Sequence, residues 1–294
     1  MLLAHLGALV AVTMWGVSFV STKVLLDNGM HPVEVYVYRF IIAYLLVLCF
    51  CHKRLMSRNL WDEGLFAVCG LCAGSIYFIA ENTALEYTLV SNVSLLTSTS
   101  PLIVVMLVGL LYRDERPNRG VIIGSLVAFF GVACVIFNSS FNLQLNPVGD
   151  FLSLAAAFGW AIYSLVLRKL NVSYDAWFVT RKTFFWGLVT ALPFLYFEPQ
   201  IMNPAHIVAV PAIWGNLLFL AVGASVIGYL MWARSVKSLG AITSNNYIYM
   251  QSIVTLVVSA IVLGERVSAV GYTGCALILF GLWLSDYLGR KYTA

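Results

Sequence analysis

Three ionisable side chains lie inside long apolar stretches of this chain, where an unpaired charge is costly. They are Lys23, Arg39 and Glu81. A charge at the centre of a hydrocarbon layer costs roughly 2.5–3.5 kcal/mol on insertion scales, so each of these groups needs a partner or a water-filled cavity. A carboxylate in such a place can carry a proton or bind a cationic group, and a basic side chain can hold a carboxylate or a phosphate.

Two interpretations of these charges are open. In the functional one, Glu81 titrates or meets a cationic group of a solute, while Arg39 or Lys23 holds an anionic group. In the structural one, Glu81 and Arg39 neutralise each other and fix two helices, and Lys23 extends to the lipid headgroups. We favour the structural interpretation for Arg39 and an anchoring role for Lys23, and leave both open for Glu81.

Polar and aromatic side chains share helix faces with these charges. Trp15, Ser18 and Phe19 follow the i, i+3, i+4 spacing of one face, and Tyr77 precedes Glu81 by four residues. Amides are costly in lipid and must bind another helix or a solute, so helix packing is the alternative to cavity lining. The candidate cavity residues are Trp15, Ser18, Phe19, Tyr77, Glu81, Thr97, Ser98, Trp160, Tyr163, Tyr229, Trp232, Asn245, Asn246 and Tyr249.

The elements that carry these residues are predicted to be membrane-spanning helices. The chain has 294 residues, of which 61% are hydrophobic and only 10% charged, whereas soluble domains average roughly 25% charged residues. Apolar stretches of the length that crosses ~30 Å of hydrocarbon recur throughout. The ten expected spans are Leu3–Leu25, Val33–Cys51, Gly64–Leu85, Leu89–Tyr112, Arg119–Phe137, Gly149–Leu167, Ala176–Phe197, Ala212–Val236, Ala241–Leu263 and Val267–Leu288.

An internal repeat organises the ten spans. Leu89 to Ile136 aligns with Leu239 to Asp286 at a constant offset of 150 residues, which matches Gly124 with Gly274. Copies separated by an odd number of spans must be inverted in the membrane, as in many secondary transporters. We therefore expect an all-α fold of two inverted five-helix repeats, residues 1–137 and 148–294, joined by an extracytoplasmic linker at 138–147.

The basic residues of the connections set the orientation, because cytoplasmic loops carry an excess of Lys and Arg. They concentrate in the even-numbered connections and the tail, as Lys53, Arg54, Arg58, Arg113, Arg116, Arg119, Arg168, Lys169, Arg234, Lys237, Arg290 and Lys291. Both termini are therefore expected in the cytoplasm. Arg181 and Lys182, at the inner start of a span, are interpreted as reaching the cytoplasmic surface.

An ordered set of motifs resembles a known family. It comprises Trp15-Gly16, Arg39, the turns Arg113-Asp114-Glu115-Arg116 and Gly264-Glu265-Arg266, and glycine-spaced spans at the end of each half. Over essentially its whole length the chain resembles the EamA family of the drug/metabolite transporter superfamily. The resemblance implies a multi-pass carrier in the plasma membrane, expected to be a bacterial cytoplasmic membrane. It also implies export of small metabolites, often amino acids, through a cavity lined by the first, third, fourth, sixth, eighth and ninth spans.

The resulting hypothesis is a secondary-active exporter that works by alternating access, with a passive facilitator or channel as the alternative. A membrane-embedded enzyme would need clustered catalytic groups, whereas His5, His31, His52 and His206 are scattered. No nucleotide-binding loop, nucleophile elbow or HExxH zinc motif is present in the sequence, so we predict no enzyme activity, cofactor or metal site. The expected partners are a small-molecule substrate and the lipid bilayer, without nucleic acid, in a monomer or homodimer.

Small residues in the spans carry structural predictions. Pro101 is expected to kink its span. The spacing of Cys69 and Cys72 suits a redox or zinc pair, but thiols in an apolar helix favour packing. The span-end glycines allow close helix contact, either within one chain, which we favour, or in a dimer seam. These are Gly120, Gly124, Gly131, Gly271, Gly274 and Gly281.

Overall fold

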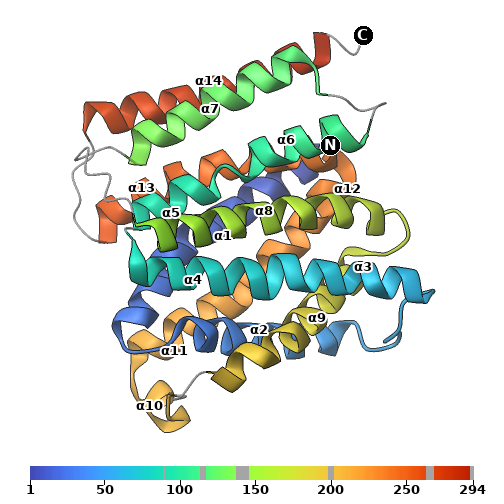
Figure 1. Cartoon of the computed structure of the whole chain (residues 1–294), viewed down its shortest axis with the longest axis vertical. Helices are drawn as coiled ribbons and strands as arrows, with labels where there is room; N and C mark the ends of the chain where they lie inside the picture. The colour runs from blue at the N-terminus through green and yellow to red at the C-terminus, as the bar shows by residue number, and fades with distance from the viewer. Residues whose placement is uncertain (89, 113–116, 137–145, 198–201, 263–267, 292–294) are drawn as a thin grey trace.

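The fold is a bundle of helices (Figure 1), seen in a computed structural model that describes residues 1–88, 90–112, 117–136, 146–197, 202–262 and 268–291. Within these ranges there is no strand, so the all-α prediction is confirmed. The helices are α1 (Leu2–Asp27), α2 (Pro32–Phe50), α3 (Leu60–Gly70), η1 (Leu71–Ile76), α4 (Tyr77–Tyr87), α5 (Val90–Thr97), α6 (Ser100–Leu111), α7 (Arg119–Ile136), α8 (Pro147–Leu170), α9 (Ala176–Phe197), α10 (Pro204–Ala209), α11 (Pro211–Leu218), η3 (Phe219–Ile227), α12 (Gly228–Asn246), α13 (Ile248–Val262) and α14 (Ala269–Lys291).

The helices have the length and surface of a multi-pass membrane protein. Among the described residues, six helices are long and apolar enough to cross a membrane, and Arg119–Val135, Ile248–Val258 and Ala269–Ser285 form shorter apolar helices. Large apolar side chains lie on the outside of the bundle, such as Leu110 (69% exposed) and Phe130 (65%). Lipid can cover such side chains at no cost, whereas in water they would form an aggregating surface. The linker at 138–147 and the two Glu-Arg turns lie largely outside the described residues.

Helices α7 and α14 pack side by side along one edge of the bundle (Figure 1). A Cβ atom on Gly124 would lie 2.5 Å from the nitrogen of Ser285, and one on Gly274 would lie 2.6 Å from the nitrogen of Val135. The two contacts are equivalent, because Gly274 lies 150 residues after Gly124 and Ser285 lies 150 residues after Val135. Gly131 with Ile278, and Gly281 with Ala128, form a second reciprocal pair. These glycines therefore serve an antiparallel contact within the chain, as the favoured alternative predicted.

Other helices also pack across the two halves in a reciprocal way. Helix α1 packs on α12 and α13, while its equivalent α8 packs on α4, α5 and α6. Helix α2 contacts η3, and its equivalent α9 contacts η1 and α3. Most of the largest fully buried side chains, such as Trp232, Tyr163 and Tyr229, belong to this shared core. Each half is thus stabilised mainly by the other.

Irregular turns occur at equivalent places in both halves. The π-helical turns η1 and η3 interrupt the helix pairs α3–α4 and α11–α12, and shifting η1 by 150 residues places it inside η3. Helix α5 ends at Thr97 and α6 begins at Ser100, which confirms the break expected before Pro101. The other half has its break at Tyr247, between α12 and α13. Such π segments are often found at functional sites.

Candidate functional site

A small cavity lies where α1, α4, α8 and the interrupted helices α5–α6 and α12–α13 meet. Its volume is about 20 Å³, room for about one water molecule. Its lining residues are Trp15, Ser18, Phe19, Tyr77, Phe78, Glu81, Thr97, Ser100, Trp160, Ile248 and Gln251. Seven of the fourteen candidate residues are in this set. The structure thus brings the candidates from α1 and α4 together with Thr97 and Trp160.

Glu81 gives the cavity its negative charge. The carboxylate is buried, with 8% of the residue exposed, and its Oε1 accepts a hydrogen bond of 2.8 Å from the Tyr77 hydroxyl. It is the one carboxylate among the lining residues that the structure describes, and none of them is Lys, Arg or His. The other polar groups of the lining are hydroxyls and one amide. A protonated amine would find its natural counter-ion here.

Aromatic rings form the wall on one side of the cavity. The Trp15 ring lies 5.0 Å from that of Trp160 and 5.1 Å from that of Trp232, measured between centroids. Tyr77 lies 5.3 Å from Trp160. Trp232 and Tyr229 do not line the cavity but support this wall, since Trp232 is fully buried against Trp15 and Tyr229 contacts both Trp15 and Trp160. The faces of such rings attract cations, so the wall suits a positively charged solute with apolar substituents.

The π-helical turns hold this wall in place. The Trp15 indole Nε1 donates to the Ala224 carbonyl in η3, at 2.9 Å. The Tyr229 hydroxyl donates to the Ala73 carbonyl in η1, at 2.6 Å. Each bond joins one half of the chain to the irregular turn of the other. A buried backbone carbonyl needs a hydrogen-bond donor. Trp and Tyr supply one while their rings fill the apolar space around it.

Arg39 lies behind the cavity wall and does not line the cavity. Its Nε donates to the Ser225 hydroxyl at 2.6 Å, and its guanidinium carbon lies 4.4 Å from the centroid of the Phe78 ring. Among the described residues, no ion pair of 4.0 Å or less joins Arg39 to Glu81. The two charges therefore make no direct contact, and their mutual neutralisation stays a prediction.

Lys23 lies apart from the cavity. Its Nζ lies 2.8 Å from Oδ1 of Asp27, one turn later on α1, and the two side chains are 43% and 59% exposed. This position near the end of α1 agrees with an anchoring role. A screened pair of this kind contributes little stability.

The amide candidates join helices in this structure. Asn246 Nδ2 donates to Ser285 at 3.0 Å, and its Oδ1 accepts from Ser125 at 3.1 Å, which ties α12 to α14 and α7. Asn245 accepts from Ser164 of α8 at 3.3 Å. Tyr249 packs in a separate apolar cluster with residues of α7 and α14. Ser98, Tyr163, Tyr229 and Trp232 are buried outside the cavity lining.

The lining also includes residues that sequence reasoning did not select. Phe78 follows the candidate Tyr77, and Ile248 follows the break at Tyr247. Nothing in their residue types separates them from core positions. Gln251 carried a signal, since an amide inside a span needs a partner. The π-helical turns that hold the aromatic wall have no sequence signal that we can identify.

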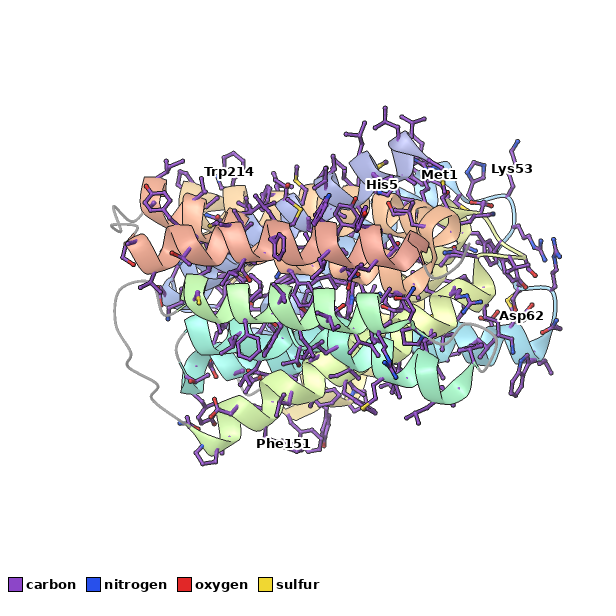
Figure 2. The ribbon with its side chains drawn as sticks, turned by 90° about the horizontal axis from the view of Figure 1, so that it is seen from above. Met1, His5, Lys53, Asp62, Phe151 and Trp214 are labelled. Atoms are coloured by element: carbon purple, nitrogen blue, oxygen red, sulfur yellow. The ribbon has the colours of Figure 1, made fainter. Side chains whose placement is uncertain are left out.

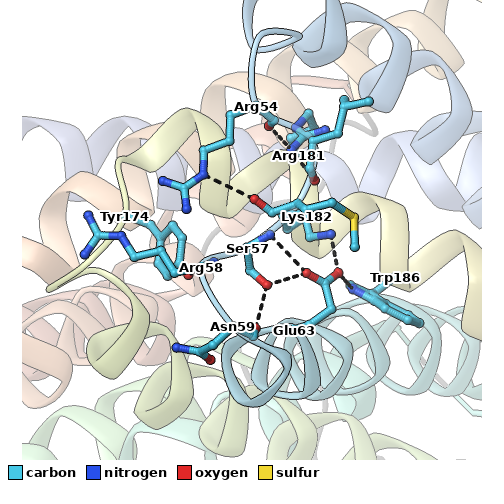
Figure 3. Close-up of polar contacts among 11 residues, drawn as sticks. Arg54, Ser57, Arg58, Asn59, Glu63, Tyr174, Arg181, Lys182 and Trp186 are labelled. Carbon is cyan, nitrogen blue, oxygen red and sulfur yellow. Dashed lines mark hydrogen bonds and ion pairs between the residues drawn. The ribbon is translucent and has the colours of Figure 1, made fainter.

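A second polar cluster lies at one end of the bundle (Figure 3), the end that Figure 2 marks with Met1, Lys53 and Asp62. The Glu63 Oε1 accepts from Lys182 Nζ and, at 2.9 Å, from Trp186 Nε1. Its Oε2 accepts from the Ser57 hydroxyl at 2.6 Å. Arg181 Nη2 donates to the Arg54 carbonyl at 2.7 Å. The cluster fastens the α2–α3 connection to α9 of the other half.

The interpretation that Arg181 and Lys182 reach the surface is wrong. They are only 2% and 3% exposed, because the connection between α2 and α3 folds over them. Buried cations need such acceptors.

The comparison with protein families decides the membership of the chain. Its residues 2–137 and 147–285 each match the model described as "EamA-like transporter family". The chain belongs to the EamA-like transporter family. Two matches, one in each half, agree with the repeat. Relatives with curated descriptions include an uncharacterized transporter of Archaeoglobus fulgidus, 25% identical over 96% of both chains.

Another relative of this EamA-like chain has a more specific name. A "Probable amino-acid metabolite efflux pump" of Escherichia coli is 24% identical, over 95% of this chain and 93% of the relative. A solved crystal structure shares the fold, with a TM-score of 0.79 at 20% identity, and 99% of each chain is covered. The protein is thus a multi-pass membrane protein of a transporter family.

Proposed function

We propose that this protein is a secondary-active transporter of the plasma membrane, which exports small metabolites such as amino acids or related compounds by alternating access. The observation that carries the proposal is the position of the Glu81 cavity between two halves that pack reciprocally. The relative named as an amino-acid metabolite efflux pump supports this solute class.

The α7–α14 contact supports an inverted arrangement of the halves, residues 1–137 and 148–294. Equivalent helices that meet in an antiparallel and reciprocal way are related by a twofold axis perpendicular to them. For helices that cross a bilayer, such an axis lies in the membrane plane. The basic connections support a cytoplasmic position for both termini and for the Glu63–Lys182 end. Ten spans complete the proposed topology.

The cavity supports a carrier over a passive facilitator or channel. Its volume of about 20 Å³ is far below that of an amino acid, and the rings of Trp15, Trp160 and Trp232 lie in contact beside it. A solute can enter only when helices separate. Symmetric halves with breaks at equivalent places allow such a movement at either end in turn.

The lining supports recognition of a protonated amine. Glu81 supplies a buried negative charge, and aromatic faces around it supply cation–π attraction. Because Glu81 holds either a proton or the cationic group, binding of one releases the other. This exchange couples export to proton entry, with no nucleotide required.

Transport by purified protein in liposomes tests the proposal. The panel consists of radiolabelled amino acids and the amines formed from them by decarboxylation. We expect saturable flux of at least one of them, driven by a proton gradient. Glu81→Gln should lower this flux by at least tenfold, about 1.4 kcal/mol, and remove its pH dependence.

The control is Glu86→Gln, which removes an exposed carboxylate of the same helix and should leave flux unchanged. If Glu81→Gln preserves both flux and pH dependence, the coupling mechanism is wrong. If no compound of the panel moves, the proposed solute class is wrong.

A further inference from the structure

A second, larger hollow lies at the end of the bundle shown in Figure 3. It has a volume of about 400 Å³ and lies between the α2–α3 connection and the start of α9. Its lining residues are Phe50, Cys51, Lys53, Arg54, Arg58, Ser173, Tyr174, Asp175, Trp177 and Phe178. We refer to this hollow as the basic groove. It is separate from the Glu81 cavity and shares no lining residue with it.

The basic groove carries an excess of positive charge. Lys53, Arg54 and Arg58 are exposed, and none of them forms an ion pair with a carboxylate among the described residues. The one acidic residue of the lining is Asp175, whose Oδ1 accepts a 3.0 Å bond from the Phe178 nitrogen at the start of α9. Three cations against one carboxylate leave a net charge of +2. An anion would therefore be attracted.

The cations are held over a fixed aromatic floor. The guanidinium carbons of Arg54 and Arg58 each lie 5.6 Å from the centroid of the Tyr174 ring. The Tyr174 hydroxyl donates to Oδ2 of Asp62 at 2.7 Å and accepts from the backbone nitrogen of Arg58 at 2.8 Å. Burial raises the pKa of Tyr174, so the hydroxyl stays protonated as a donor. Stacking orients both guanidinium groups. The Arg54 Nε donates to the Met56 carbonyl at 3.2 Å, and the remaining guanidinium N–H groups can donate to phosphate oxygens.

The rim of the basic groove is apolar. Phe50, the last residue of α2, is 74% exposed, and its ring lies 5.3 Å from that of Trp177. Aromatic side chains at helix ends suit the boundary between headgroups and hydrocarbon. A soluble anion would make no use of this rim. A phospholipid would place its phosphate at the cations and an acyl chain beside Phe50.

We infer that the basic groove binds the phosphate headgroup of an anionic phospholipid. Basic pockets between helices at the membrane surface recognise such headgroups. The groove is built by the α2–α3 connection of one half and by α9 of the other, so a bound lipid joins the two halves. The inference does not depend on the solute that the protein carries.

Native mass spectrometry of the purified, delipidated protein tests this inference. The lipid probes are phosphatidylglycerol and phosphatidylcholine, which differ in net charge. We expect phosphatidylglycerol to bind more tightly. The double variant Lys53→Gln/Arg58→Gln should weaken this binding by about 30-fold, since each surface cation contributes on the order of 1 kcal/mol.

The matched control is Arg234→Gln/Lys237→Gln. It removes the same charge from exposed positions outside the lining, and it should retain wild-type binding. An equal loss in this control would show attraction by net charge alone and overturn the site, as would wild-type affinity in Lys53→Gln/Arg58→Gln.

Two further measurements distinguish the source of the phosphate. Phe50→Ser keeps all the cations and should still weaken phosphatidylglycerol binding, because it removes the apolar rim. Inorganic phosphate and glycerol 3-phosphate should not compete with the lipid at equal concentration. Unchanged binding in Phe50→Ser, or effective competition by either soluble anion, would overturn the assignment to a lipid.

Discussion

Replacement of Lys182 by methionine should destabilise the protein strongly, because it breaks a buried ion pair that joins the two halves. Only 4% of the Lys182 side chain and 13% of the Glu63 side chain are exposed. Removal of one partner of a buried pair costs about 3–5 kcal/mol, since the other charge stays uncompensated. Glu63 keeps its bonds to Ser57 and Trp186. We therefore expect the low end, about 3 kcal/mol.

A second substitution separates charge from packing. In Glu63→Gln/Lys182→Met the glutamine oxygen can still accept from Trp186, and neither position of the former pair carries a charge. We expect this double variant to recover about 2 kcal/mol relative to Lys182→Met. The matched control is Lys23→Met, which removes the exposed pair with Asp27 and should cost less than about 1 kcal/mol.

The free energies can be measured by SDS-induced unfolding in detergent micelles, followed by far-ultraviolet circular dichroism. All variants are compared at the same micelle concentration. The reasoning is refuted if Lys182→Met is no less stable than Lys23→Met, or if Glu63→Gln/Lys182→Met is no more stable than Lys182→Met.

The same titration tests the helix seam and the aromatic wall. Gly124→Ala should lower the free energy of unfolding by about 3 kcal/mol, because its Cβ would lie 2.5 Å from a backbone nitrogen of α14. Gly64→Ala, where no atom lies within 4 Å of the added Cβ, should raise the free energy of unfolding by about 0.5–1 kcal/mol. Equal effects of Gly124→Ala and Gly64→Ala would contradict the close contact of α7 with α14. Trp15→Phe should cost about 1–3 kcal/mol, because it leaves the Ala224 carbonyl without its donor. Trp160→Phe is the control, since the Trp160 Nε1 has no acceptor among the described residues, and a larger loss there would contradict the role of the bond.

The sequence predicted the cavity residues that depend on helix periodicity. Trp15, Ser18 and Phe19 share one face of α1, and the spacing of Tyr77 and Glu81 brings both into the cavity. This works because the period of a helix fixes which side chains point the same way. The glycine spacing of the last span in each half likewise predicted close helix contact within the chain, which α7 and α14 make with each other.

Features that depend on the packing of distant segments could not be predicted in this way. Asn246 bonds to Ser125 and Ser285 because α7 and α14 pack against α13 next to it. Its residue type alone suits helix packing and cavity lining equally. The burial of Lys182 depends on the fold of a connection far away in sequence. The π-helical turns arise from a backbone rearrangement that changes no residue pattern.

Counterflow in proteoliposomes is the most direct test of the central claim that two reciprocal halves expose the Glu81 cavity to each side in turn. Liposomes are loaded with unlabelled solute, the best substrate of the amino acid and amine panel, and then diluted into a trace of the labelled compound. A carrier of this kind should accumulate label transiently above its equilibrium level, because each inward movement of label is exchanged for an outward movement of unlabelled solute. Label that rises only to equilibrium, with flux linear in concentration, would show a passive pore and contradict the account.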